Sequence, residues 1–255
     1  MMKRYRAVIF DLFDTVVLFD YMKMPEIVVK GNPRRTTMGM TYELLRERCP
    51  DVGWDAFFDA LADEDDALRA QKEAGKEISS TARFSGVVKR LVPERPDLLA
   101  REFIEDLVGK HMRALLDCVH LPAEHPAILQ ELGRTHRIAL LSNFDYAPAA
   151  EAMIDEMGLR EYFVRIAISD KLGWRKPHPR VFLQLVEELG VEPGETLYVG
   201  DTYETDVVGA KSAGLDAAWV NPKGLEPGEV RPDIEVSGLP ELRDRLSPGG
   251  KGRIE

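Results

Sequence analysis

The sequence contains little of what a disulfide framework or a zinc site needs. Its 255 residues include only two cysteines, Cys49 and Cys118, which lie far apart and belong to no CxxC or Cys/His spacing. Two isolated thiols are typical of a protein in a reducing compartment, so we expect a cytoplasmic location. A chain of this length can bury a substantial core, so it needs neither a disulfide nor a structural metal to fold.

Long uncharged apolar runs are also missing. No window approaches the roughly 18 uncharged apolar residues of a membrane span. The apolar stretch that follows the basic start of the chain ends at Asp11. We therefore expect neither a membrane-spanning helix nor a signal peptide.

Basic residues are outnumbered by acidic ones, with 34 Lys and Arg against 44 Asp and Glu. The formal net charge is -10, and no stripe of Lys and Arg stands out. This balance disfavours nucleic acid as a partner, because basic surfaces bind its phosphate backbone. A local group of Lys or Arg can still reverse the field inside a cleft, so the partner we expect is a small, anionic substrate.

The pattern of apolar residues indicates an α/β fold with a helical insert. A buried first strand at residues 6–10 is followed, from about residue 21 to 118, by a region in which strand signals largely vanish. Apolar residues recur there at helical spacing in four segments, at 41–48, 54–71, 80–91 and 98–116.

After residue 125 helices and strands alternate. Between the expected strands lie expected helices at 126–134, 147–157, 179–189 and 206–213. The strands are expected at 137–141, 163–168, 196–199 and 217–220, where the series closes. Such alternation is typical of a parallel sheet with right-handed crossovers.

Polar residues stand at the ends of these strands or just beyond them. They are Asp11, Ser142, Lys176, Asp201 and Asp206. Taken singly, each can be a helix cap, a turn residue or a solvated loop residue. Open α/β sheets bind ligands at the carboxyl ends of their strands, so we interpret the five together as an active site.

Four motifs around these residues, taken in order, resemble those of the haloacid dehalogenase superfamily of hydrolases. They are FDLFDT at 10–15, LLSN at 140–143, KPHP at 176–179 and GDTYETD at 200–206. The resemblance implies a Rossmann-like parallel sheet core with an α-helical cap inserted after the first strand. The predicted division is a core of residues 1–18 and 121–246, a cap of residues 19–120 and a flexible tail of residues 247–255.

The resemblance also implies a nucleophile and a metal site. Asp11 would attack the substrate and form a covalent aspartyl intermediate. Mg²⁺, a hard cation, would be bound by the carboxylates of Asp11 and Asp201. The third protein ligand would be the backbone carbonyl of Phe13, which does not depend on the side chain of that residue.

The remaining motif residues would handle the transferring group. Lys176 would neutralise the nucleophile and, with Ser142 and Asn143, bind the phosphoryl oxygens. Asp206 would orient Lys176 or a metal-bound water. In the predicted cap, three arginines are candidates for anion recognition: Arg34, Arg35 and Arg83.

Phe13 departs from the phosphatases of this superfamily, which usually carry an Asp at this position. That Asp protonates the leaving oxygen and then activates water, so Phe13 removes a general acid–base group. Asp14 follows, at a position that is commonly Gly. The superfamily's 2-haloacid dehalogenases also have an aromatic residue here and need neither an acid nor a metal.

We predict a Mg²⁺-dependent phosphatase that hydrolyses a small phosphate monoester through an aspartyl-phosphate at Asp11. The alternatives are a metal-independent 2-haloacid dehalogenase and a degenerate family member that binds a ligand without catalysis. Phe13 favours the alternatives. Asp201 favours the phosphatase, because without a cation its carboxylate would repel both a carboxylate substrate and the nucleophile.

Overall fold

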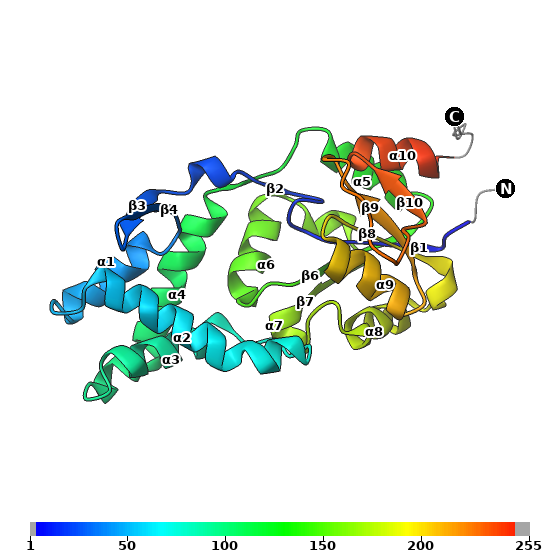
Figure 1. Ribbon diagram of the computed structural model, residues 1–255. Helices are drawn as coiled ribbons and strands as arrows, with labels where there is room; N and C mark the ends of the chain where they lie inside the picture. Colours follow the sequence, from blue (N-terminus) through cyan, green and yellow to red (C-terminus); the bar gives the residue numbers. More distant parts are fainter. Residues whose placement is uncertain (1–3, 248–255) are drawn as a thin grey trace. The chain divides into compact units, whose positions relative to one another are not determined.

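The computed structural model describes residues 4–247, which divide into two compact units (Figure 1). The first unit takes the described residues within Met1–Leu18, His120–Phe144 and Ile154–Glu255. The second takes Phe19–Val119 and Asp145–Met153. Of the predicted tail, residues 248–255 lie outside the described residues.

The segment Asp145–Met153 departs from the predicted division, which placed it in the core. The carbonyl of Asp145 accepts a hydrogen bond of 2.7 Å from the backbone amide of Ser80, which lies in the helical insert. Contacts between such distant parts of the chain leave no trace in local periodicity, so the sequence did not predict this grouping.

The first unit contains a six-stranded sheet with the strand order β10-β9-β8-β1-β6-β7, and every recorded pairing within it is parallel. All four residues of β1 are fully buried, as expected for an apolar strand covered on both faces. The strands are β1 Ala7–Phe10, β6 Arg137–Ser142, β7 Arg165–Ile168, β8 Thr196–Gly200, β9 Asp216–Val220 and β10 Ile234–Val236.

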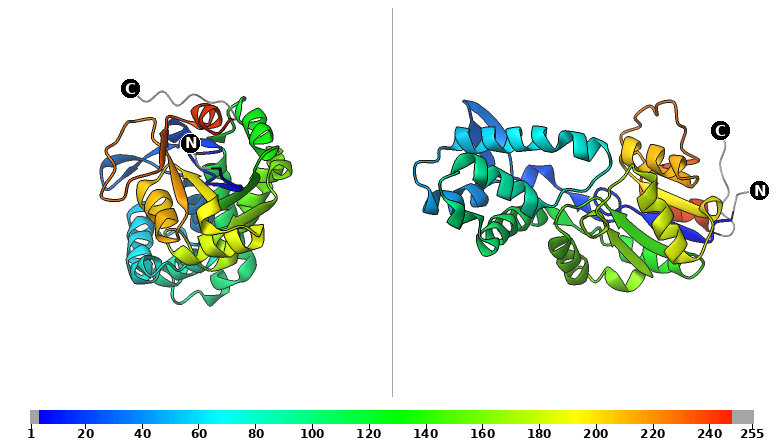
Figure 2. Two further views of the ribbon diagram at one scale, coloured as in Figure 1. Left: turned by 90° about the vertical axis from the view of Figure 1, so that its right-hand side faces the viewer. Right: turned by 90° about the horizontal axis from the view of Figure 1, so that it is seen from below.

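Helices cover both faces of this sheet (Figure 1). Helices α8 and α9 pack together on one face, and α5 and α10 pack together on the other, as Figure 2 also shows. Alternate strand residues such as Ile9, Ala139 and Tyr198 form a core with Phe182 of α8. The helices of this unit are α5 His125–Gly133, α7 Ser169–Leu172, α8 Pro179–Leu189, α9 Gly209–Ser212 and α10 Leu239–Leu246.

Two elements of the first unit differ from the prediction. The helix predicted at 206–213 begins earlier, as the π-helix Tyr203–Val208, and continues as α9. The sheet also continues beyond residue 220, because β10 pairs with β9 and is followed by α10. A three-residue strand behind a loop rich in Pro and Gly carries too few apolar positions to show a period, so the sequence did not predict it.

The second unit is mainly helical, with α1 to α4 near the four predicted segments. The fourth is shorter than predicted, because a 3-10 turn precedes it and the backbone angles of Ala100, a φ of -56° and a ψ of 135°, are not helical. The buried side chains include Phe57, Phe84 and Leu107, one from each of three helices. The elements are α1 Gly39–Arg48, α2 Trp54–Glu73, α3 Ser80–Leu91, the turn Pro96–Leu99, α4 Arg101–Leu116 and the start of α6, Ala147–Glu156.

The second unit also holds a β-hairpin that the sequence did not predict. Strands β3 Glu26–Val29 and β4 Asn32–Arg35 are antiparallel, and the turn residues Lys30 and Gly31 both have positive φ angles, of 49° and 77°. Positive φ at both central residues is the geometry of a tight hairpin turn. All four residues of β4 are exposed, so the apolar alternation that reveals a half-buried strand is missing.

Two short strands, β2 Leu18–Phe19 and β5 Val119–His120, pair where the chain enters and leaves the helical insert. In the part of the chain that the structure describes, no helix combines the length and the apolarity that crossing a membrane requires.

Candidate active site

The register of the central strands brings the predicted motifs to the same edge of the sheet. Phe10, the last residue of β1, lies beside Leu140 of β6 and Val199 of β8. Because the three strands are parallel, Asp11, Ser142 and Asp201 follow close to one another at their carboxyl ends. The Asp11 amide also donates a 2.8 Å hydrogen bond to the carbonyl of Val199, which continues the pairing.

Lys176 is the centre of the hydrogen-bond network at this edge. Its buried ammonium donates to Asp11 Oδ1 at 2.6 Å, to Asp206 Oδ1 at 2.7 Å and to the Tyr198 hydroxyl at 2.7 Å. The Tyr198 hydroxyl in turn donates to the carbonyl of Leu141 at 3.1 Å. All three ammonium protons are therefore used, and the direction of the Lys176 side chain is defined by the residue after β1, a residue within β8 and a residue of the π-helix that follows β8.

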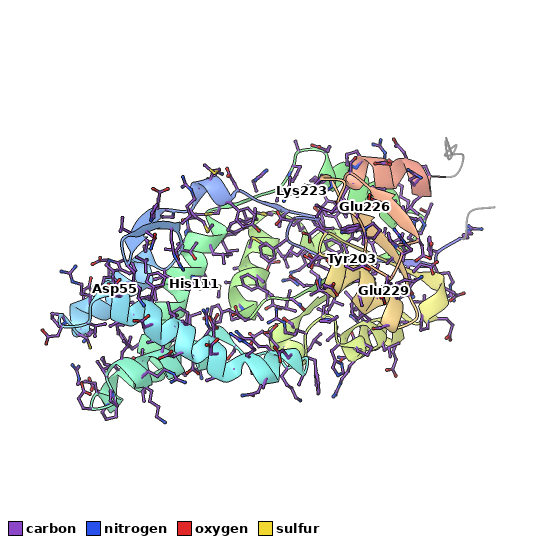
Figure 3. The ribbon with its side chains drawn as sticks, viewed as in Figure 1. Asp55, His111, Tyr203, Lys223, Glu226 and Glu229 are labelled. Atoms are coloured by element: carbon purple, nitrogen blue, oxygen red, sulfur yellow. The ribbon has the colours of Figure 1, made fainter. Side chains whose placement is uncertain are left out.

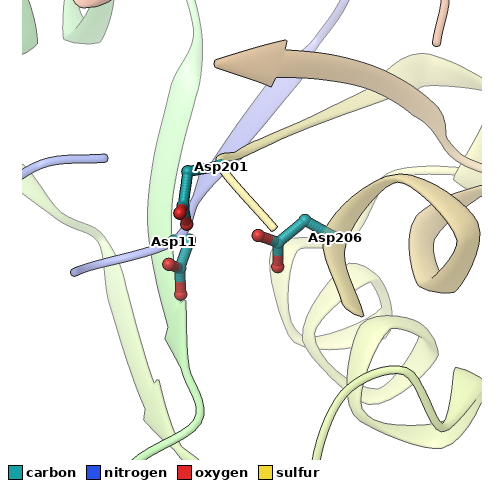
Figure 4. Close-up of side chains that lie close together, drawn as sticks. All are labelled: Asp11, Asp201 and Asp206. Atoms are coloured by element: carbon teal, nitrogen blue, oxygen red, sulfur yellow. The ribbon is translucent and has the colours of Figure 1, made fainter. Parts of the chain in front are cut away.

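Three carboxylates lie close together at this edge of the sheet (Figure 4). Asp11, Asp201 and Asp206 each offer an oxygen atom, and these atoms lie within 4.8 Å of one another. Asp206 already uses both oxygens, Oδ1 for Lys176 and Oδ2 for the backbone amide of Thr202 at 2.9 Å. Asp11 and Asp201 are therefore the better placed of the three to bind a cation directly.

The cluster carries more negative than positive charge. With all three carboxylates ionised, the ammonium leaves two negative charges in a largely buried site. Burial raises the pKa of Asp11 to about 7 against the opposing effect of Lys176, and Asp206 and Asp201 add to the rise. Burial also raises the pKa of Asp201 to about 6, with further contributions from Asp206 and Asp14.

The same charges act on the lysine. Burial alone would lower the pKa of Lys176, but the carboxylates of Asp11 and Asp206 outweigh it, so this pKa is raised and the ammonium stays charged. Oxygen ligands and two uncompensated negative charges fit a hard divalent cation such as Mg²⁺. The carboxylate cluster could therefore hold a metal ion.

Two buried hydroxyls near the strand ends also point to a ligand. Ser142, the last residue of β6, is 1% exposed, and Thr15, at the end of the first motif, is 2% exposed. Within residues 4–247 neither hydroxyl oxygen has a hydrogen-bond partner. Unpaired buried polar groups cost stability and are rare, so each hydroxyl can accept or donate a bond to a bound molecule.

Asn143 contacts the main chain of Lys176. Its side-chain nitrogen donates to the Lys176 carbonyl at 3.0 Å, and its side-chain oxygen accepts from the Lys176 amide at 2.8 Å. This two-point contact ties the segment that carries the lysine to the end of β6. The predicted contact of Asn143 with substrate stays a prediction, which its backbone amide could fulfil.

The ring of Phe13 packs beside the site. It is stacked on the ring of Phe144, with centroids 5.2 Å apart and planes 18° from parallel. Asp14, the next residue, has a φ angle of 55°, a left-handed conformation that Asp adopts more readily than most residues. The position that usually carries the general acid is thus occupied by an apolar ring.

Several supporting residues could not be recognised from the sequence. Tyr198 read only as part of a buried strand, although a buried tyrosine hydroxyl generally needs a polar partner. The indole N–H of Trp219 donates a 2.8 Å hydrogen bond to the carbonyl of Asp201, and the ring of Tyr203 packs against the ring of Trp219. The Tyr203 hydroxyl donates to the carbonyl of Val230 and accepts from its amide, which fixes the loop before β10 (Figure 3).

The three arginines proposed for anion recognition lie in the second unit. Arg35 donates to the carbonyls of Met22 and Met24, and Arg83 pairs with Asp65 at 2.7 Å. Arg34 lies on the exposed strand β4. A role in binding an anion stays a prediction for all three.

Comparison with known families identifies the class of protein. Residues 5–214, which include the four motifs at the carboxyl edge of the parallel sheet, match the family model of haloacid dehalogenase-like hydrolases. The chain therefore belongs to this family, as the motifs predicted.

Among curated relatives, N-acylneuraminate-9-phosphatase of Mus musculus is 38% identical over 119 residues, which cover 46% of this chain and 48% of the relative. The chain thus spans about half the length of this relative and of its rat and human counterparts.

Two solved structures cover nearly the whole chain. One is a 2-haloacid dehalogenase from Pseudomonas syringae pv. Tomato DC3000, with a TM-score of 0.71, 21% identity and coverage of 96% of this chain and 100% of that chain. The other is the hydrolase YfnB from Bacillus subtilis bound to magnesium, with a TM-score of 0.62, 23% identity and the same coverage. Similarity at these identities shows the fold.

Proposed function

We propose that the protein is a Mg²⁺-dependent phosphatase that hydrolyses a small phosphate monoester through an aspartyl-phosphate at Asp11. The observation that carries the proposal is the ammonium of Lys176 held between Asp11 and Asp206, next to Asp201, in a buried site. This arrangement keeps a nucleophilic carboxylate at a defined position and leaves two negative charges that a divalent cation would balance. The phosphatase among the curated relatives supports the same chemistry.

In the first step an oxygen of Asp11 attacks phosphorus, and the bond between phosphorus and the leaving oxygen breaks. The electron pair departs with that oxygen, and the phosphoryl group stays on Asp11. In the second step water attacks phosphorus, the bond to Asp11 breaks, and phosphate and the free carboxylate are released. Lys176 stays charged throughout and stabilises negative charge on Asp11 and on the transferring group.

The unpaired hydroxyls of Ser142 and Thr15 would bind phosphoryl oxygens, together with the backbone amide of Asn143. Lys176, whose three protons are donated to Asp11, Asp206 and Tyr198, would act on the same oxygens through its positive charge. Such donors act mainly where charge builds up in the transition state. Truncating one of them should therefore lower kcat more than it changes KM.

The residues that would hold Mg²⁺ are Asp11 and Asp201, through their carboxylates, and Phe13, through its backbone carbonyl. The bound ion would neutralise the carboxylates and draw charge from the phosphoryl group. The magnesium bound to the structurally similar hydrolase YfnB supports this choice of metal. Asp206, with both oxygens committed, would hold Lys176 in place instead of binding the metal directly.

The test is hydrolysis of a broad panel of phosphate esters, each assayed with Mg²⁺ and after removal of divalent ions by a chelator. We expect turnover only with Mg²⁺ and none from Asp11→Asn, a nearly isosteric variant whose folding is checked by circular dichroism. A phosphorylated peptide that contains Asp11, found by mass spectrometry after rapid quenching, would identify the intermediate. Equal activity after chelation, or no activity across the panel, would contradict the proposal.

A second candidate function is 2-haloacid dehalogenation, which Phe13 favours because halide leaves without protonation. Halide release from a 2-haloacid in the presence of a chelator, lost in Asp11→Asn, would support it. Asp201 opposes it, since an uncompensated carboxylate there repels a carboxylate substrate. A folded protein that turns over neither class would instead be a non-enzymatic, ligand-binding family member.

A further inference from the structure

We propose that Phe13 restricts the enzyme to phosphoryl donors whose leaving group departs without being protonated, such as acyl, enol and aryl phosphates, and disfavours simple alkyl phosphates. The inference rests on the proposed phosphatase function and adds the substrate class. Its basis is the chemistry of one position, which lies two residues after Asp11 and carries a ring instead of an acid.

The ring of Phe13 forms an apolar wall with Phe144. Phe13 follows Asp11 by two residues, and Phe144 follows Ser142 by two residues, so the neighbouring loops after β1 and β6 each contribute one ring. The two rings stack with centroids 5.2 Å apart, and Phe144 is only 8% exposed. This part of the site therefore offers the leaving group an apolar surface and no proton.

Lys176, Tyr198 and Asp206, which form the hydrogen-bond network around Asp11, are already committed to other bonds. Lys176 donates its three protons to Asp11, Asp206 and Tyr198, and Tyr198 donates its own proton to the carbonyl of Leu141. Asp206 accepts hydrogen bonds at both oxygens. A proton given to the leaving group by any of these residues would break the network that holds the lysine.

Asp14 is the carboxyl group next to Phe13 in the chain, so the experiment must separate the two. The backbone of Asp14 is left-handed, with a φ of 55°. Asp14 also stands one residue beyond position 13, where related phosphatases carry their general acid. Substituting each residue in turn shows which of them, if either, controls protonation.

The consequence for the substrate follows from the charge on the leaving oxygen. Without an acid, the electron pair of the broken bond departs on that oxygen, and solvent protonates it afterwards. The conjugate acid of the leaving group has a pKa of about 4 for a carboxylate and about 10 for a phenolate. An alkoxide is comparable to hydroxide, whose conjugate acid has a pKa of about 16. Transfer from an alkyl phosphate to Asp11 is therefore the reaction that suffers most from the loss.

The experiment measures kcat/KM for acetyl phosphate, a series of substituted phenyl phosphates and an alkyl phosphate. This ratio reports the steps through formation of the aspartyl-phosphate, so slow hydrolysis of the intermediate does not mask the effect. We expect log kcat/KM of the wild-type enzyme to fall steeply with the pKa of the leaving group. A burst of phenolate equal to the enzyme concentration should precede the steady state, because the second step also lacks its usual base.

The variant Phe13→Asp restores the carboxyl group. We expect it to raise kcat/KM for the alkyl phosphate by about 10²–10⁴-fold relative to acetyl phosphate, which is the usual contribution of a general acid. Phe13→Asn is the matched control, since it introduces a side chain of the same size and polarity that cannot donate a carboxyl proton. Asp14→Asn should leave the slope of the wild-type enzyme unchanged.

Three outcomes would overturn the inference, and they are distinct. A slope that is shallow in both the wild-type enzyme and Asp14→Asn would overturn it while leaving the phosphatase function intact. A slope that is shallow in the wild type and becomes steep in Asp14→Asn would assign the acid to Asp14. No turnover of any phosphate ester would overturn the phosphatase function and the inference with it.

Discussion

Asp201→Asn provides a direct test of the electrostatics of the carboxylate cluster. Burial, Asp206 and Asp14 raise the pKa of Asp201 from 3.8 to about 6 in the folded protein. The folded protein therefore holds this proton more tightly than the unfolded chain does. As the pH rises from about 4 to 6, the unfolded chain releases the proton first, so the metal-free protein loses stability over this window.

The size of the loss follows from the shift in pKa. One pKa unit corresponds to about 1.36 kcal/mol, so a shift of about two units gives an upper bound of about 3 kcal/mol. Asp201 is partly exposed, and solvent screening reduces this to about 1–2 kcal/mol. Asparagine has nearly the same shape and does not ionise, so the variant escapes the loss and gains stability over the wild type as the pH rises.

The assay compares urea unfolding of the two proteins at several pH values between 4 and 7, with a chelator present. The comparison is needed because other groups titrate in the same window. The pKa of His111, for example, is lowered to about 4 by burial and by Arg83, so that residue adds stability as the pH rises. This contribution is common to both proteins and cancels in the difference.

The expected result is a difference in unfolding free energy that moves by about 1–2 kcal/mol in favour of Asp201→Asn between pH 4 and 7. A difference that does not change with pH would refute the reasoning. Adding Mg²⁺ at pH 7 should then reverse the order, because a ligand at 100 times its dissociation constant stabilises the wild type by about 2.7 kcal/mol and the variant by less.

Three further substitutions test the network around Lys176. Tyr198→Phe should reduce the unfolding free energy by about 1.5–3 kcal/mol and lower kcat, because it removes one acceptor from a buried ammonium. Tyr5→Phe is the control: Tyr5 lies before β1 and its hydroxyl donates to Asp216, so its loss should leave kcat unchanged. Asn143→Ala should cost about 1–3 kcal/mol in urea unfolding, since it leaves the Lys176 amide and carbonyl unpaired. Gly200→Ala should cost about 1–3 kcal/mol and reduce turnover, because a Cβ at this position would overlap the Asp206 carboxylate.

The sequence predicted the parts of the fold that follow a strong local period. β8 is buried along its whole length, α8 has a buried apolar face, and Gly or Pro stands near the ends of both, so β8 and α8 begin and end within a residue of the prediction. It did not predict β3, β4 and β10, which are short and carry at most one buried residue each. Their existence depends on turn geometry and on pairing with other strands, which no local pattern records.

For the site, the sequence identified residues by type and position, and the structure adds their partners. The motifs pointed to Asp11, Lys176 and Asp206, but the sequence does not reveal that one ammonium reaches both carboxylates. Tyr198 could not be distinguished from an apolar strand residue. Its role depends on the approach of the loop that carries Lys176, which is a property of the tertiary fold.

Phe13 illustrates how one position can keep one function and lose another. A main-chain carbonyl is directed by the turn between Asp11 and Thr15, so it can bind a cation whichever side chain the residue carries. Proton transfer depends on the side chain alone, and here that side chain is a ring stacked on Phe144. Under the proposed mechanism, metal binding and leaving-group protonation are therefore separable in this chain, although related phosphatases combine them in a single Asp.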